Sequence, residues 1–200
     1  MDLNHRLAIL PAAAAVALLS ACSPTASAWH GTAYDNPPAA REVVGEATNN
    51  DSPAIGAPSG NVTLVYFGYT HCPDFCPATM AVARELFEQL GAQADRVRFV
   101  FVTVDPERDT LPVLAEYVSA FDPRFIGLRP ASDDLPELLA AYGAAAFVDP
   151  EGHELPGDSV IAHTTRVFLI DQEGKLRVHY PFDTTAEDLR VDVQRLLEDG

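Results

Sequence analysis

The chain has 200 residues, of which 48% are hydrophobic, and it carries a formal net charge of −16 at pH 7. This length and apolar content suit one globular domain with a single core. So large a negative charge argues against a protein that binds nucleic acid, and against electrostatic docking on anionic lipid.

The first 21 residues have the pattern of a lipoprotein signal peptide. The apolar run at 7–19 is too short to span a bilayer and contains Pro11. The four residues that end at Cys22 resemble a lipobox, in which the cysteine is lipidated and becomes the mature N-terminus. We therefore expect cleavage after residue 21 and a lipid anchor on Cys22. The protein would then be extracytoplasmic, on the periplasmic side of the cell membrane.

Residues 22–58 are rich in Ser, Pro, Ala, Gly and Asn and contain few periodic apolar positions. This composition predicts a flexible, lipid-anchored tether with little fixed structure. The folded domain is expected over residues 59–200.

The first half of that domain alternates short apolar runs with helical patterns. The runs at 62–69 and 97–104 predict strands, and a helical pattern at 77–90 joins them into a β-α-β unit. Two more helices are predicted at 111–121 and 135–142. A short apolar segment, 125–128, lies between these two helices.

The last part of the chain is expected to be antiparallel. The apolar runs at 160–170 and 176–180 flank a polar turn, which predicts a hairpin. Leu189, Val193 and Leu197 form one face of a closing helix. Together these elements predict an α/β domain with a central mixed sheet flanked by helices.

Two cysteines, Cys72 and Cys76, follow the first predicted strand directly. Because Pro77 is well tolerated as a first helical residue, we expect Cys76 to be the N-cap, with both sulfurs at the helix N-terminus. The helix dipole there favours thiolate. A structural disulfide is the alternative for a secreted protein, but it would close a very small loop and stabilise little. We therefore favour a functional pair.

Three residues separate the cysteines, one more than in thioredoxin-like oxidoreductases, which gives the sulfurs room to hold one ion. Cu(I) accepts two or three ligands and prefers sulfur, whereas structural zinc normally needs four. His163 is the candidate third ligand, because it lies at the start of the penultimate predicted strand. Two thiolates and an imidazole would suit both Cu(I) and Cu(II). A lone histidine near a strand is more often structural, so the residues alone leave its role open.

Three ordered motifs resemble the Sco/SenC family: the segments 66–77 and 103–110, and His163 six residues before Leu169. The resemblance covers roughly residues 59–200. It implies a thioredoxin-like, membrane-tethered copper chaperone that binds copper through Cys72, Cys76 and His163 and delivers it to the binuclear copper site of cytochrome c oxidase. The implied partner is the copper-bearing oxidase subunit or another copper chaperone.

Two features depart from the family pattern. Residues 39–60 lack the alternation of the β-hairpin that usually precedes the first core strand, so we expect that hairpin to be shortened or lost. Phe75 stands where an aliphatic residue is common.

The two cysteines leave other functions open. A thiol-disulfide reductase could keep the client's copper-site cysteines reduced, with one of the pair attacking and the other resolving. A redox sensor is a third possibility. Reductases of this fold generally place a cis-proline before the penultimate strand, but here no proline lies between Gly157 and Pro181. This favours metal binding over enzymatic activity. A reversible disulfide between Cys72 and Cys76 would prevent copper binding while it lasts.

Overall fold

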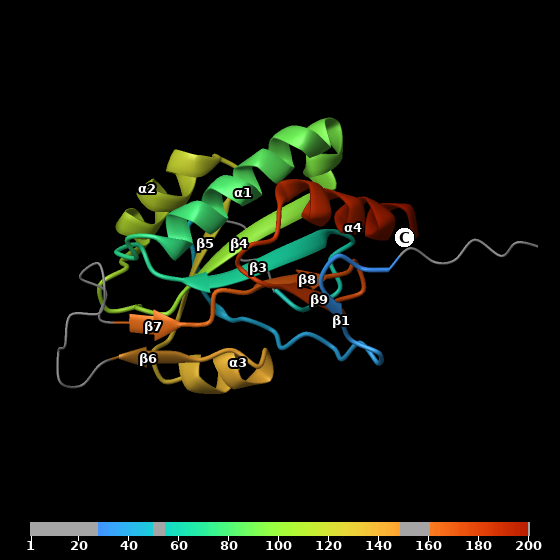
Figure 1. The fold of residues 1–200 in the computed structure, drawn as a ribbon. Coiled ribbons are helices and arrows are strands. Elements are labelled where there is room, and N and C mark those ends of the chain that lie inside the picture. Colours follow the sequence, from blue (N-terminus) through green and yellow to red (C-terminus); the bar gives the residue numbers. More distant parts are fainter. Residues whose placement is uncertain (1–27, 50–54, 149–160, 200) are drawn as a thin grey trace, which may run out of the picture.

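The structure is a computed structural model that describes residues 28–49, 55–148 and 161–199. Its centre is a seven-stranded mixed sheet with the order β1-β9-β8-β3-β4-β5-β2 (Figure 1). The strands of this sheet are β1 (Thr32–Ala33), β2 (Gly45–Ala47), β3 (Val62–Gly68), β4 (Val97–Thr103), β5 (Ile126–Pro130), β8 (Val167–Ile170) and β9 (Leu176–Tyr180). A separate antiparallel pair contains β6 (Ala146–Val148) and β7 (Ile161–His163).

The helices are α1 (Phe75–Leu90), α2 (Leu111–Phe121), α3 (Leu135–Ala141) and α4 (Ala186–Asp199), with a 3-10 helix η1 (Gly91–Arg96) after α1. Figure 1 shows α1, α2 and α4 on one side of the sheet, and α3 with the β6-β7 pair on the other. No helix in the described part of the chain is long and apolar enough to cross a lipid bilayer.

The core lies around β3, in which all seven residues are buried. This strand runs parallel to β4 and antiparallel to β8. Burial on both faces explains why its sequence is an almost continuous apolar run rather than an alternating one. The predicted α/β fold, with a central mixed sheet flanked by helices, is confirmed.

The apolar run at 160–170 does not form one strand, as the sequence had suggested. It contains β7 and β8, with residues 164–166 between them. The two strands pair with different partners, because β7 joins β6 outside the main sheet while β8 joins β3 within it. His163 therefore ends β7 and precedes β8 by four positions.

The expectation of little fixed structure is wrong for residues 28–49. Here β1 pairs with β9 and β2 pairs with β5, so the segment covers both edges of the main sheet. Its Trp29 ring lies against the guanidinium groups of Arg177 and Arg195. Edge strands present unpaired backbone groups, and this segment satisfies part of them. Strands of two and three residues are too short to leave a periodic pattern in the sequence.

The predicted signal peptide and Cys22 lie outside the described residues. We expected the family's usual hairpin before the first core strand to be shortened or lost, and the described residues there form β2 and an isolated bridge between Val43 and Ile55. Both Val43 and Ile55 are buried. The domain edge is therefore covered, although the usual hairpin alternation is missing from the sequence.

Candidate metal centre

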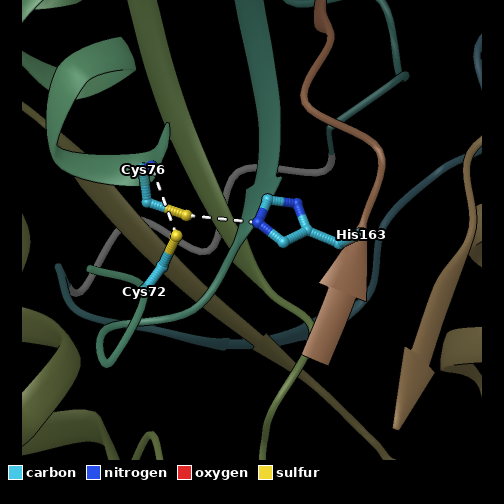
Figure 2. Close-up of side chains that lie close together, drawn as sticks. All are labelled: Cys72, Cys76 and His163. Atoms are coloured by element: carbon cyan, nitrogen blue, oxygen red, sulfur yellow. Dashed lines mark hydrogen bonds between the residues drawn. The ribbon is translucent and has the colours of Figure 1, made fainter. Parts of the chain in front are cut away.

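Cys72, Cys76 and His163 meet at one end of β3 (Figure 2). Cys72 lies in the loop between β3 and α1, Cys76 in the first turn of α1, and His163 at the end of β7. Their Sγ and imidazole nitrogen atoms all lie within 4.8 Å of one another. The structure thus brings together the three ligands expected from the sequence.

Helix α1 begins two residues earlier than predicted. Its N-cap is Asp74, whose carbonyl oxygen accepts a hydrogen bond from the Ala78 amide at 3.3 Å. Cys76 is therefore inside the helix and is not its cap. Pro77 is tolerated at the third helical position, because amides of the first turn have no intrahelical partner in any case.

This start of the helix makes the two sulfurs unequal. Cys76 is fully buried, whereas Cys72 keeps 7% of its surface exposed. The backbone amide of Cys76 donates to Cys72 Sγ at 3.4 Å. The amides of the helix N-terminus therefore stabilise negative charge on Cys72, the sulfur that lies outside the helix.

A glycine at the end of β3 makes room for the buried sulfur. A Cβ atom at Gly68 would lie 2.8 Å from Cys76 Sγ and 2.9 Å from the Phe101 ring. On the same strand, the Tyr66 hydroxyl donates a hydrogen bond to Cys76 Sγ at 3.6 Å. Strand β3 thus shapes both the space and the polarity around Cys76.

The ring of His163 is oriented by its own loop. Its Nδ1 atom lies 3.1 Å from the carbonyl oxygen of Thr164, which can only accept, so Nδ1 carries the proton. The Nε2 atom keeps a lone pair and lies 3.4 Å from Cys76 Sγ. The rings of Tyr66 and Tyr69 meet the imidazole edge-on, at 6.1 and 5.6 Å between centroids. A backbone partner that fixes the tautomer is the usual arrangement for a metal-binding histidine.

The two thiols differ in acidity. Hydrogen bonding from the Cys76 side chain, assisted by the backbone amides of Cys76 and Asp74, lowers the pKa of Cys72 to about 4, although burial opposes this. Burial, followed by the nearby Cys72, raises the pKa of Cys76 well above that of a free thiol. The expectation that the helix favours both thiolates is therefore right for Cys72 and wrong for Cys76.

The donor set decides which ions fit. Among the described residues, the cluster contains two sulfurs and one nitrogen and no fourth histidine, cysteine or carboxylate. Two thiolates and an imidazole suit Cu(I), whereas a structural zinc site would need a fourth ligand. The same pair, with one acidic and one buried sulfur, also has the chemistry required for thiol-disulfide exchange.

Sequence reasoning missed two residues that support the centre. Tyr66 was hidden because it lies within the apolar run of β3. Asp109 is fully buried and accepts hydrogen bonds from Thr70 and Thr103. Its position in a charged loop gave no sign of burial, and only the three-dimensional arrangement shows that it holds the segment before Cys72.

Fold and site together define a thioredoxin-like domain that carries a soft-metal centre. The chain belongs to the SCO1/SenC family, whose sequence model matches residues 47–198. This confirms the resemblance seen in the sequence motifs.

Two relatives with similar sequences agree with the assignment to this family. The chain is 32% identical over 138 residues to "Protein SCO2 homolog, mitochondrial" of Bos taurus, covering 68% of this chain and 51% of that protein. It therefore spans about half the length of this relative. It is 33% identical over 151 residues to a "Putative copper-binding protein" of Stutzerimonas stutzeri, covering 74% of this chain and 72% of the relative.

Two solved structures are similar along most of their length. ScoI of Bradyrhizobium japonicum, a structure with copper bound, superposes with a TM-score of 0.70 at 31% identity and covers 80% of this chain and 100% of its own. The apo Sco1 protein of Thermus thermophilus gives a TM-score of 0.71 at 30% identity and covers 86% of this chain and 99% of its own.

Proposed function

We propose that this protein is a copper chaperone that binds one copper ion through Cys72, Cys76 and His163 and supplies it to the binuclear copper site of cytochrome c oxidase. The observation that carries the proposal is the convergence of two sulfurs and an imidazole nitrogen within 4.8 Å. The copper-bound Bradyrhizobium structure, at 31% identity, supports copper as the ion.

The three side chains contribute in different ways. Cys72 offers a thiolate already at neutral pH, since its pKa is lowered to about 4. Cys76 holds its proton in the metal-free protein, because burial raises its pKa, so loading with copper releases that proton. His163 presents Nε2 without rearrangement, because the Thr164 carbonyl holds the Nδ1 proton. Copper is the cargo, and the residues bind and release it without turning over a substrate.

The tether and the partner complete the proposal. A lipid on Cys22 would hold the protein at the extracytoplasmic face of the cell membrane, where an oxidase subunit exposes its copper site. The client is that copper-bearing subunit or another copper chaperone. Support for the anchor comes from the sequence around Cys22 alone.

A second candidate is a thiol-disulfide reductase that keeps the client's cysteines reduced. The observation in its favour is the asymmetry of the pair. Cys72, which has the more acidic thiol and is the more exposed of the two cysteines, could attack a disulfide as a thiolate. The buried thiol of Cys76 could then resolve the mixed disulfide. The two functions differ in their need for His163.

One experiment separates the two functions. The reduced full-length chain, in a Cys22→Ser background that leaves only Cys72 and Cys76 as thiols, is titrated with Cu(I) against a competing chelator. The same preparation is assayed for reduction of a disulfide peptide. We expect one Cu(I) per chain. His163→Ala should weaken binding more than about tenfold, because even outer-shell partners of metal ligands contribute that much.

The control is His179→Ala, which changes a half-buried histidine on β9. It should leave copper affinity unchanged. If His163→Ala bound Cu(I) as tightly as the parent chain and still reduced the disulfide peptide, the chaperone proposal would be wrong and the reductase would replace it.

A further inference from the structure

A second histidine adjoins the metal-binding segment in the sequence. His71 directly precedes Cys72 in the chain, and its side chain is 57% exposed. It does not belong to the cluster of ligand atoms formed by Cys72, Cys76 and His163. Its Nδ1 atom lies 3.1 Å from the hydroxyl oxygen of Thr70. The direction of this hydrogen bond decides what His71 can do.

The direction follows from the partner of Thr70. The Thr70 hydroxyl donates its only proton to Oδ1 of Asp109 at 2.6 Å. The other oxygen of Asp109 accepts from the Thr70 amide at 3.0 Å and from the Thr103 hydroxyl at 2.6 Å. A carboxylate that accepts three hydrogen bonds in a fully buried position acts as an acceptor only. The Thr70 oxygen must therefore accept from His71.

It follows that Nδ1 of His71 carries the proton. In the neutral imidazole the lone pair is then on Nε2, the nitrogen away from Thr70. Among the described residues, the polar contacts of His71 run through Nδ1, to Thr70 and Asp109. This repeats the arrangement at His163, where the Thr164 carbonyl fixes the Nδ1 proton and leaves Nε2 for the ion. A chain of imidazole, hydroxyl and buried carboxylate is a typical outer shell of a metal ligand.

The exposure of the two sulfurs shows where an ion can pass. Cys76 is fully buried, Cys72 keeps 7% of its surface exposed, and His163 is partly exposed. An incoming or leaving ion therefore exchanges ligands on the side of Cys72 and His163, away from Cys76. Cu(I) is stable with two or three ligands, so a neighbouring donor can bind the ion before another ligand dissociates.

We propose that His71 is an outer copper ligand, which takes the ion at the surface beside Cys72 and passes it to or from the inner centre. This rests on the proposed function as a copper carrier. Copper remains Cu(I) throughout, and the step exchanges one ligand for another without electron transfer. Thr70 and Asp109 are positioning residues that keep Nε2 of His71 free for the ion.

The first test needs no metal. Nitrogen-15 NMR of the imidazole rings in the reduced, copper-free chain reports which ring nitrogen carries the proton. We expect the Nδ1-protonated form at His71 in the parent chain and in Thr70→Ser, which keeps the hydroxyl. Thr70→Val, which lacks the hydroxyl, should lose the Nδ1-protonated form of His71. An Nε2-protonated His71 in the parent chain would overturn the inference.

The second test measures copper exchange. Chains loaded with Cu(I) are mixed with the chelator bicinchoninate, and transfer is followed by stopped-flow absorbance. His71→Gln should leave equilibrium affinity within about twofold but slow transfer by about tenfold, the size of effect known for residues next to metal ligands. Thr70→Val should slow transfer similarly although it retains the imidazole, and Thr70→Ser should restore the rate.

His30→Gln is the matched control, because His30 also pairs with a buried carboxylate, Asp192, but lies at the β1 edge of the sheet. It should transfer at the parent rate. Parent-rate transfer by His71→Gln would overturn the relay and leave the chaperone function intact. An affinity loss in His71→Gln as large as in His163→Ala would overturn it too, by making His71 a permanent ligand. Failure of the parent chain to bind Cu(I) would instead remove the proposed function itself.

Discussion

The Nε2 atom of His163 lies 3.4 Å from the sulfur of Cys76, although 87 positions separate the two residues in the chain. The contact exists because β7 leaves the main sheet to pair with β6, and the chain then turns back to form β8 beside β3. The end of β7 is thereby carried to the start of α1 (Figure 2). The geometry of the candidate metal centre therefore depends on the break at residues 164–166.

Oxidation of the cysteine pair should act as a gate for copper. A disulfide between Cys72 and Cys76 consumes both sulfur ligands, so the oxidised chain should bind no copper and should regain one site per chain on reduction. The measurement is copper content after gel filtration, with free thiols counted in parallel. Stoichiometric copper on a Cys22→Ser chain that has no free thiol would show that the ion is held elsewhere.

The acidity of Cys72 predicts how alkylation depends on pH. A thiolate is the reactive form and is present above the pKa of its thiol, which for Cys72 is lowered to about 4. Iodoacetamide should therefore label Cys72 at a nearly constant rate between about pH 5 and 8, a range over which an ordinary cysteine with a pKa of about 8.5 gains reactivity steeply. Mass spectrometry of tryptic peptides gives the rate for each cysteine.

Hydrogen bonding from the Cys76 side chain is the largest cause of this low pKa, so Cys76→Ala should raise the pKa of Cys72 and make its labelling fall at the acid end of that range. Cys76 should remain the slower of the two throughout, because burial keeps it protonated. Equal labelling of both cysteines at pH 6 in the folded chain would contradict the asymmetry of the pair.

Gly68→Ala should damage the metal centre by crowding it. The added methyl group would lie 2.8 Å from Cys76 Sγ, so the sulfur or the strand must shift, and overpacking of this kind costs about 1–3 kcal/mol. We expect a lower melting temperature together with weaker Cu(I) binding. Gly127→Ala is the matched control, because its Cβ would lie 2.5 Å from Leu114 in the core between β5 and α2.

Gly127→Ala should lose about as much stability in urea unfolding as Gly68→Ala, but its copper affinity should stay at the parent value. If both variants lost affinity in proportion to their loss of stability, Gly68 would have no special relation to Cys76.

Trp29→Ala should test whether the N-terminal segment is part of the domain. The indole ring lies 5.6 and 4.5 Å from the guanidinium carbons of Arg177 and Arg195, and cation-π contacts at partly exposed sites contribute about 0.5–1 kcal/mol each. We expect the free energy of unfolding to fall by about 1–2 kcal/mol with copper affinity unchanged. Faster amide hydrogen exchange should be confined to β1 and β9.

The control for Trp29→Ala is Val44→Ala, at a residue that is 71% exposed. It should change neither the free energy of unfolding nor the rate of amide hydrogen exchange. Parent-like stability and exchange in Trp29→Ala would mean that residues 28–49 behave as the flexible tether that their composition suggests.

Sequence patterns predicted those elements that follow from local physics. The strands β3 and β4 appear as continuous apolar runs because both are buried on two sides, and the bounds of α2 and β9 were predicted to the residue. The start of α1 was misplaced because a proline is acceptable at several positions of a first turn, so Pro77 could not identify the cap.

What the sequence could not show depends on distant partners. The short strands β1, β2 and β6 exist only because an open edge or a partner strand lies nearby. The place of His163 at the start of a predicted strand made it a candidate, but its role as a ligand was inferred from the family resemblance, since a lone histidine near a strand is more often structural. The unequal acidity of the cysteines depends on the burial of Cys76, which a motif cannot reveal.

The most direct test of the central claim is X-ray absorption at the copper edge of the Cu(I)-loaded chain in the Cys22→Ser background. The parent chain should show two sulfur neighbours and one nitrogen neighbour per copper, and His163→Ala should lose the nitrogen and keep both sulfurs. An identical spectrum in the His163→Ala chain, with the nitrogen neighbour still present, would contradict the assignment of Cys72, Cys76 and His163 as the copper site.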